Sequence, residues 1–261
     1  MKYKISAALA TFNEEDNITD CIRSLKKFAD EIIVVDGKSQ DKTAELAKKE
    51  GAKVILTENK PMFHINKNKA IENCSGKWIF LIDADERVSE ELAQEIKRVV
   101  AQNPKDNGYW VSRRNWFLGG FLTKGGAYPD SVIRLFRKGK GRLPEESVHE
   151  QVKISSPIGH LKNDILHLAD PTFSRYLLRA NRYTSQTAEL IAKKDPGSGL
   201  HTIIFYMFIK PALTFLSIYF RHKGYKDGFR GFAWALFSSA HHFYAYIKYL
   251  TRLNNTKFKL N

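Results

Sequence analysis

The sequence has very little cysteine, with only Cys21 and Cys74 in 261 residues. They form no CxxC pair, and no histidines stand at zinc-finger spacing, so we expect neither a disulfide framework nor a structural zinc site. The first ten residues lack the apolar run and the small-residue cleavage site of a signal peptide. The sequence contains no internal repeat and no low-complexity tract. These absences favour a folded protein of the reducing cytoplasm.

Acidic residues are scarce relative to basic ones. The chain has 42 lysines and arginines against 28 aspartates and glutamates, a formal net charge of +14. Such an excess favours polyanionic partners, which include nucleic acid, nucleotide phosphates and anionic lipid headgroups, without choosing among them. The length suits one large α/β catalytic domain with an appendage.

The first hundred residues alternate short β-rich apolar runs with helix-like stretches, which predicts βαβ units and a mostly parallel, Rossmann-like sheet flanked by helices. We expect strands at residues 5–10, 31–36, 54–57 and 78–82, and helices at residues 18–25, 41–50 and 64–73. Polar residues follow these strands, and the carboxyl ends of parallel strands are where open α/β sheets bind ligands. Thr11 to Glu14, Asp36 and Asp83 to Asp85 are therefore expected to converge on one crevice.

Asp83-Ala84-Asp85 directly follows a buried apolar strand. Two carboxylates at positions i and i+2 can hold a hard divalent cation through oxygen ligands, and Mg²⁺ or Mn²⁺ on a diphosphate is the natural use. The alternative is a loop with two solvated acids, because short motifs also match by chance. The position at a nucleotide-binding crevice favours the metal.

Three segments resemble the signatures of family 2 glycosyltransferases: residues 11–15 (TFNEE), 34–43 (VVDGKSQDKT) and 80–86 (FLIDADE). The resemblance implies the GT-A fold, a UDP-sugar donor, a divalent metal and inversion at the anomeric carbon. On that analogy Thr11, Phe12, Asn13, Glu14 and Asp36 hold the nucleoside, with Asp36 near the uracil. Asp83 would face the ribose and metal region beside Ala84, and Asp85 would ligate the metal. The family commonly has a basic residue on the preceding helix, where Lys69 is preferred to Lys67; either lysine alone also fits a solvated helix face.

The segments 129–136 (PDSVIRLF) and 145–150 (EESVHE) resemble a narrower set of bacterial family 2 enzymes that includes lipopolysaccharide core glucosyltransferases. An inverting transfer needs a base for the acceptor hydroxyl, and Glu145, Glu146 and Glu150 all qualify. Glu146 is the first choice by resemblance, although the usual Glu-Asp pair is missing. His149 would complete the metal shell or orient a phosphate, and the alternative is a structural histidine. Arg134 would offer its planar fork to a phosphate or form an ordinary ion pair.

The organisation changes along the chain. Residues 109–152 are aromatic-rich and punctuated by glycine, which favours irregular strands and loops over further βαβ units. We therefore expect a GT-A catalytic domain at residues 1–172, with a nucleotide-sugar-binding half (1–100) and an acceptor-binding half (101–172). Residues 173–261 form a helical, apolar extension.

Two apolar, aromatic stretches in this extension, 200–220 and 229–250, flank a basic segment. Lys210 and Pro211 at the centre of the first argue against a clean membrane span. We expect helices that lie on an anionic membrane surface; the alternative is packing in a core or on a second subunit.

The sequence predicts a hexosyltransferase that acts on a glycan acceptor, such as a lipid-linked lipopolysaccharide core, at the inner face of the cell membrane. A nucleotidyltransferase is the competing enzyme class, but it requires a Gly-rich phosphate loop that residues 11–15 do not provide. A nucleic-acid-binding protein would interleave aromatic and basic residues, whereas the aromatic residues here gather in the apolar tail.

Overall fold

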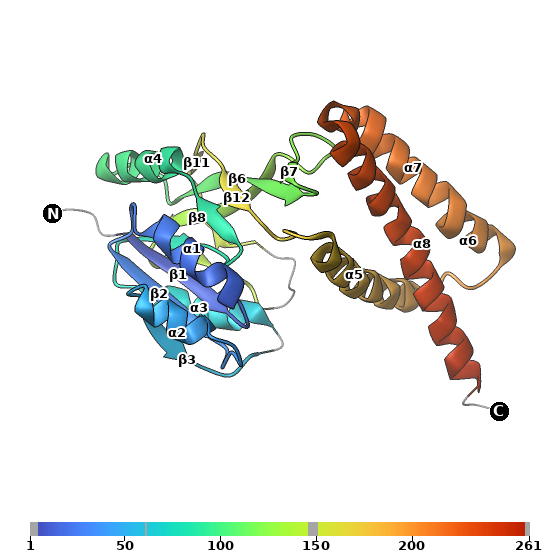
Figure 1. Cartoon of the computed structure of the whole chain (residues 1–261), viewed down its shortest axis with the longest axis horizontal. Coiled ribbons are helices and arrows are strands. Elements are labelled where there is room, and N and C mark those ends of the chain that lie inside the picture. The colour runs from blue at the N-terminus through green and yellow to red at the C-terminus, as the bar shows by residue number, and fades with distance from the viewer. Residues whose placement is uncertain (1–4, 61, 146–150, 259–261) are drawn as a thin grey trace. The chain divides into compact units, whose positions relative to one another are not determined.

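The computed structural model describes residues 5–60, 62–145 and 151–258 and divides into two compact units. The first unit comprises residues 1–114 and 130–168, and the second comprises residues 115–129 and 169–261 (Figure 1). Residues 115–129 thus belong with the helical C-terminal part. The domain boundary at residue 172 and the acceptor-binding role of residues 101–172 stay predictions.

Four parallel strands form one side of the sheet in the first unit, in the order β3-β2-β1-β4. Their bounds agree with the predicted strands to within one residue: β1 (Ile5–Thr11), β2 (Glu31–Asp36), β3 (Lys53–Leu56) and β4 (Trp78–Leu81). The connections are α1 (Glu15–Leu25), α2 (Thr43–Lys49) and α3 (Phe63–Asn73). The predicted βαβ organisation is confirmed.

Strand residues alternate between two cores, because successive side chains point to opposite faces of a sheet. Ala7 and Leu9 of β1 pack in the cluster that contains the buried side of α1, whereas Ala8 packs in the cluster that contains Ala70 of α3. Helices therefore cover both faces of the parallel part, and the centres of β2 and β4 are continuous apolar runs.

The rest of the sheet is largely antiparallel. β8 (Asp130–Arg137) runs antiparallel to β4 and to β6 (Gly108–Phe117), and β12 (Ile165–His167) runs antiparallel to β5 (Glu86–Val88). Further elements are α4 (Glu90–Ala101), β9 (Gly141–Arg142), β10 (Lys153–Ile154) and β11 (Ile158–His160). β6 and β8 are longer than the irregular segments expected here and pair with one register shift, between Tyr109 and Trp110, while Gly119, Gly125 and Gly126 fall outside the two strands.

The second unit is helical. Its elements are β7 (Gly120–Phe121), α5 (Phe173–Lys194), α6 (Leu200–Ile204), η1 (Phe205–Ile209), α7 (Lys210–Leu216), η2 (Ser217–Arg221), η3 (Gly224–Asp227) and α8 (Gly228–Phe258). Tyr246 of α8 stacks on Tyr206, and Phe232 meets Phe215 edge to face. These contacts pack α8 along the helix that α6, η1, α7 and η2 make together.

That composite helix, Leu200–Arg221, contains two π turns, η1 and η2. The first comes just before Pro211, whose ring excludes a regular α-turn at this point because it would meet the carbonyl of the preceding turn. A π turn inserts one extra residue and so changes which residues share a helix face. The helix is long and apolar enough, with mean hydropathy 1.7, to cross a membrane.

Candidate active site

The residues that were expected to converge follow the carboxyl ends of neighbouring parallel strands. Thr11 at the end of β1 is in register with Asp36 at the end of β2, and the Ile82 amide donates to the Ala8 carbonyl as the chain leaves β4. The loops after β1, β2 and β4 consequently begin at one edge of the sheet.

Asp36 is the point at which the first two loops are joined. Its carboxylate accepts hydrogen bonds from the Thr11 hydroxyl (3.0 Å), the Ser39 hydroxyl (2.6 Å) and the Ser39 amide (2.9 Å). The side chain is completely buried. In this structure Asp36 therefore organises the loops, and its contact with a nucleoside stays a prediction.

The loop after β1 is locked onto the loop after β2. The Asn13 amide donates to the Ser39 hydroxyl (2.9 Å), and the Gln40 amide donates to the Asn13 side-chain oxygen (2.9 Å). Asn13 adopts a left-handed conformation (φ 54°), which asparagine tolerates better than most residues. The Glu14 amide donates to the Thr43 hydroxyl (2.7 Å), while Phe12 remains exposed. Hydrogen bonds between the two loops therefore hold Thr11, Asn13, Glu14 and Asp36 in place.

Asp83 lies between two cations. Lys67 of α3 forms an ion pair with one carboxylate oxygen, and Arg134 of β8 donates to the other (2.7 Å). Burial alone would raise the pKa of Asp83, but the charges of Lys67 and Arg134 outweigh burial and hold it well below the usual value. Asp83 is therefore ionised, and Lys67, rather than the preferred Lys69, is the lysine that contacts the motif. Lys69 donates to the Thr57 hydroxyl (3.1 Å).

Glu86, the last residue of the motif, extends this cluster. Its two oxygens accept from the Arg134 guanidinium (2.6 Å) and from the Asp83 amide (3.0 Å). Arg113 of β6 reaches Glu86 (3.4 Å) and Asp130 (2.7 Å). Glu86 is completely buried, and Arg134 is only 5% exposed. Sequence reasoning gave Glu86 no role, although Glu86 is the last residue of the signature segment 80–86.

Asp85 faces a different partner from Asp83. The His167 Nε2 atom at the end of β12 lies 3.5 Å from an Asp85 carboxylate oxygen. Burial lowers the pKa of His167, but the hydrogen bond and charge of Asp85 outweigh it and raise that pKa above the usual value. Sequence reasoning missed His167, because the pairing of β12 with β5 brings the two residues together.

The predicted base and one predicted metal ligand fall largely outside the described residues, which exclude Glu146, His149 and Glu150. Glu145 is described: one of its oxygens accepts from the Asn68 side chain (2.8 Å) and from Arg142 (3.0 Å). These bonds attach the start of the segment to α3, and His64 of that helix contacts the Pro144 carbonyl (2.8 Å).

The described residues contain no group of three or more histidine, cysteine, aspartate or glutamate side chains arranged to hold a metal. Asp85 with His167 still fits Mg²⁺ or Mn²⁺ in part, because these ions often take one or two carboxylates and complete their shell with substrate phosphates and water. Asp83 fits less well, since both of its oxygens already accept from cations.

Comparison with known proteins decides the family. The family model described as "Glycosyl transferase family 2" matches residues 6–149, more than half of the chain. The chain is a family 2 glycosyltransferase. The relative described as lipopolysaccharide core biosynthesis glycosyltransferase LpsC, of Rhizobium meliloti, is 30% identical to this glycosyltransferase over 248 residues, which are 93% of this chain and 90% of the relative. The predicted family and the α/β fold class with a helical apolar extension are confirmed.

Two solved structures are similar to this glycosyltransferase. S. aureus TarS is 15% identical, with a TM-score of 0.48, over 95% of this chain and 88% of that chain. Mycobacterium tuberculosis glucosyl-3-phosphoglycerate synthase, crystallised with Mn²⁺, UDP and glucosyl-3-phosphoglycerate, is 23% identical, with a TM-score of 0.37, over 44% of each chain. Family membership rests on the family model and on the rhizobial relative.

Proposed function

We propose that this glycosyltransferase transfers glucose or a related hexose, with inversion, from a UDP-sugar to a glycan carried on a lipid, such as a lipopolysaccharide core. The observation that carries the proposal is the convergence of the Thr11–Asp36 loops and of Asp83 and Asp85 at one edge of the sheet. Ligands of open α/β sheets bind at this edge. The rhizobial relative named for lipopolysaccharide core biosynthesis supports the class of acceptor.

In the proposed donor site, the loop from Thr11 to Glu14, which Asp36 holds in place, binds the nucleoside, and Lys67, Arg134 and Asp83 bind the region of the ribose and phosphates. Lys67 and Arg134 fix the direction of the Asp83 carboxylate before substrate binds, because each binds a different oxygen. Preorganised groups reduce the entropy lost on binding. Asp85 and His167, with His149, would hold Mg²⁺ or Mn²⁺, which when bound neutralises charge on the departing diphosphate.

The protein's part in the chemistry is to accept one proton. The acceptor hydroxyl oxygen attacks the anomeric carbon from the face opposite the departing UDP, and a carboxylate takes its proton. Glu146 is our first choice, with Glu145 and Glu150 as alternatives. Both hydrogen bonds to Glu145 occupy the same oxygen, so that oxygen is not free to take the proton of an acceptor hydroxyl.

The test is turnover of a panel of nucleotide sugars with Mn²⁺ present, on lipid-linked glycan acceptors. We expect UDP-glucose or a related UDP-hexose to react. Glu146→Gln should lower kcat by roughly 10² or more with donor affinity preserved, since it removes only the proton acceptor. Glu145→Gln and Glu150→Gln are the matched controls. If Glu146→Gln is nearly normal and one control is inactive, the base is that other glutamate; if no UDP-hexose reacts, the proposed donor is wrong.

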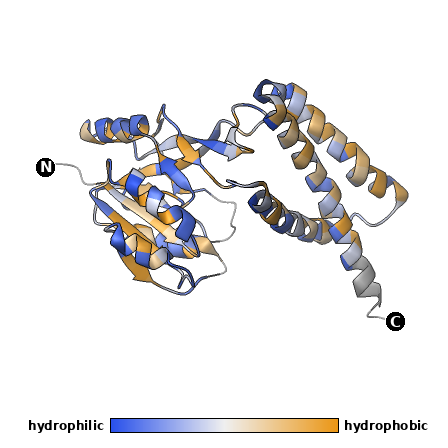
Figure 2. Ribbon diagram, viewed as in Figure 1, coloured by the Kyte–Doolittle hydropathy of each residue, from blue (hydrophilic) through white to orange (hydrophobic). Residues whose placement is uncertain are grey.

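The second unit supports attachment to an anionic membrane surface. Leu200, Ile204, Phe208, Leu216 and Phe220 are each 42–73% exposed and recur at multiples of four residues along Leu200–Arg221. Figure 2 shows this helix as a largely hydrophobic ribbon. In a regular α-helix, side chains spaced every four residues rotate around the helix axis by about 200° over this length. Each π turn adds one residue and so reverses roughly 100° of that rotation. The two π turns therefore keep the stripe on one face.

Charge and packing favour a helix lying in the headgroup layer. Lys210, the only charged residue between His201 and Arg221, is not part of the exposed apolar stripe, and the basic residues Arg221, Lys223 and Lys226 follow the helix. Such a surface combines apolar burial with attraction to anionic lipid. The location proposed is the inner face of the cell membrane.

Vesicle sedimentation tests the surface. Leu216→Gln should weaken binding to anionic vesicles roughly thirtyfold, since burial of a leucine side chain contributes about 2 kcal/mol. Leu56→Gln changes an equally exposed leucine of the first unit and should have no effect. High salt should weaken binding by the wild type. Binding that resists salt and alkaline carbonate would mean insertion across the bilayer. Absence of binding to any vesicle would indicate that the stripe packs on a second subunit.

A further inference from the structure

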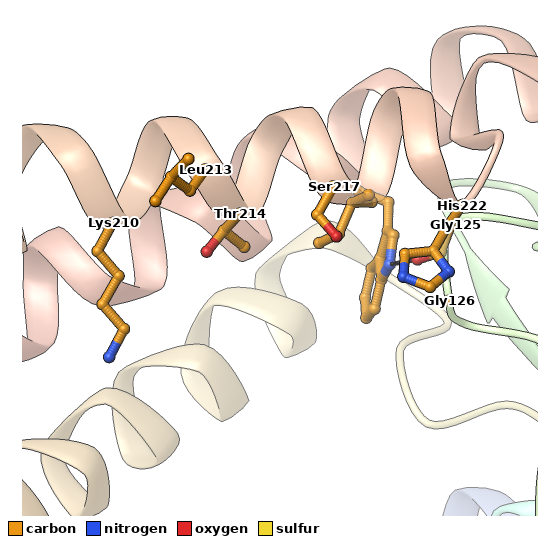
Figure 3. A pocket seen from close by; sticks show the side chains of 9 residues that line it. Gly125, Gly126, Lys210, Leu213, Thr214, Ser217 and His222 are labelled. Carbon is orange, nitrogen blue, oxygen red and sulfur yellow. Dashed lines mark hydrogen bonds between the residues drawn. The ribbon is translucent and has the colours of Figure 1, made fainter.

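A groove in the second unit has no part in the donor site. It is an open groove with a volume of about 420 Å³, lined by Gly125, Gly126, Lys210, Leu213, Thr214, Ser217, Ile218, His222 and Trp234 (Figure 3). Binding sites for small molecules typically fall in the range of roughly 300–1,000 Å³. The groove is therefore large enough for a ligand the size of a sugar phosphate.

The groove carries positive charge and no acid. None of the lining residues is an aspartate or glutamate, and in the part of the chain that the structure describes Lys210 forms no ion pair. Its ammonium group lies 5.0 Å from the centre of the Tyr206 ring. Two aspartates of the same unit bind other groups: Asp195 accepts from the Tyr249 hydroxyl (2.8 Å), and Asp227 accepts from the Thr123 amide. A partly desolvated lysine without a counter-ion favours an anionic ligand.

Hydroxyl groups extend along the same side of the helix. Thr214 and Ser217 follow Lys210 at helical spacing, and all three side chains point to the same side of the helix, with His222 beyond Ser217 (Figure 3). Among the described residues neither hydroxyl hydrogen-bonds to protein. Lysine, two hydroxyls and an imidazole form a donor-rich wall, which suits phosphate and sugar oxygens.

The opposite wall is built from backbone that only glycine accommodates. Gly125 has φ +66°, and a Cβ atom there would lie 3.2 Å from the Trp234 ring and 3.4 Å from Ile218. The Trp234 indole donates to the Gly125 carbonyl (3.2 Å), and the Gly125 amide donates to the His222 carbonyl (3.0 Å). These bonds fix the loop against the helix, so the groove is preformed.

From these features we infer that the groove binds the phosphate group of a phosphorylated saccharide, with the phosphate on Lys210 and the sugar along Thr214, Ser217 and Trp234. The inference rests on the proposed function in one respect: it assigns to the second unit a site for a phosphorylated part of the acceptor. The phosphate is either free in solution or carried on a lipid, and the two sources present the same chemistry to Lys210.

The experiment compares glucose 1-phosphate with glucose, by calorimetry on the full chain saturated with UDP and Mn²⁺ so that the donor site is filled. Glucose 1-phosphate should bind and glucose should bind far more weakly. Lys210→Gln should lower the affinity for glucose 1-phosphate about tenfold or more, because it removes a charged hydrogen bond. Thr214→Val should lower the same affinity a few-fold. The matched control is Lys193→Gln, an exposed lysine of α5 in the same unit, outside both the groove and the basic segment after the apolar helix. A second arm measures vesicles of phosphatidylcholine with and without phosphatidic acid.

Each result supports or overturns the inference. A loss specific to Lys210→Gln with glucose 1-phosphate supports a soluble source, and the same loss only on phosphatidic acid vesicles supports a lipid source. If Lys210→Gln matches Lys193→Gln in both arms, or if phosphate adds no affinity in either arm, the inference is wrong. UDP affinity is measured in the same samples, so failure of the groove is distinguished from failure of the donor site.

Discussion

Replacement of Glu86 by glutamine tests how Asp83 is held in place. Each Glu86 oxygen accepts a hydrogen bond, one from Arg134 (2.6 Å) and one from the Asp83 amide (3.0 Å). Glutamine has one oxygen and one NH₂ group, so in either orientation its NH₂ group faces a donor. The substitution also leaves three cations (Lys67, Arg113, Arg134) facing two of the three original carboxylates.

The expected cost is about 3 kcal/mol of unfolding free energy, the lower end for disruption of a buried ion pair, because glutamine keeps the size of glutamate and one acceptor. For a unit of this size, that corresponds to a fall in Tm of roughly 6–12 °C. Asp83 should also lose its fixed direction, so UDP affinity should fall. Urea unfolding measures the stability, hydrogen exchange of residues 78–88 localises the effect to the first unit, and calorimetry measures UDP binding.

The matched control is Glu90→Gln. Glu90 lies 3.2 Å from Lys27, but its side chain is 58% exposed, and such surface pairs contribute less than about 1 kcal/mol. If Glu86→Gln is as stable as Glu90→Gln and binds UDP like the wild type, Glu86 does not position Asp83 and the reasoning is refuted.

Three further predictions concern single residues. Asp85→Ala should abolish transfer and the Mn²⁺ dependence of UDP binding while thermal unfolding stays normal; unchanged turnover, with EDTA harmless, would exclude a role for Asp85 with a metal. Asp227→Ala removes the acceptor for the amide and hydroxyl of Thr123 and should lower stability by about 1–3 kcal/mol in urea unfolding. Gly125→Ala should destabilise more than Gly119→Ala, because both positions have positive φ but only the first would bring a Cβ against neighbouring atoms; equal melting temperatures would contradict this.

The sequence alone determined the parallel half of the sheet. Apolar strands such as β4 are buried on both faces and read as continuous runs, and the helix between β1 and β2 shows its buried face at Ile18, Cys21, Ile22 and Leu25. These signals are local. The polar residues that follow the strands were therefore placed at one edge of the sheet from their order along the chain, since parallel strands end on the same side.

Tertiary structure decided which partners these residues have. Asp83 meets Arg134 and Asp85 meets His167 only because β8 pairs with β4 and β12 pairs with β5, and pairings over such separations leave no periodic signal in a sequence. The choice of Lys67 over Lys69 likewise depends on how α3 packs, because the two lysines are neighbours in sequence but turn to different sides of the helix. The π turns that keep the apolar stripe on one face depend on backbone hydrogen bonding, so composition identified an apolar stretch while only the fold showed which of its side chains are exposed.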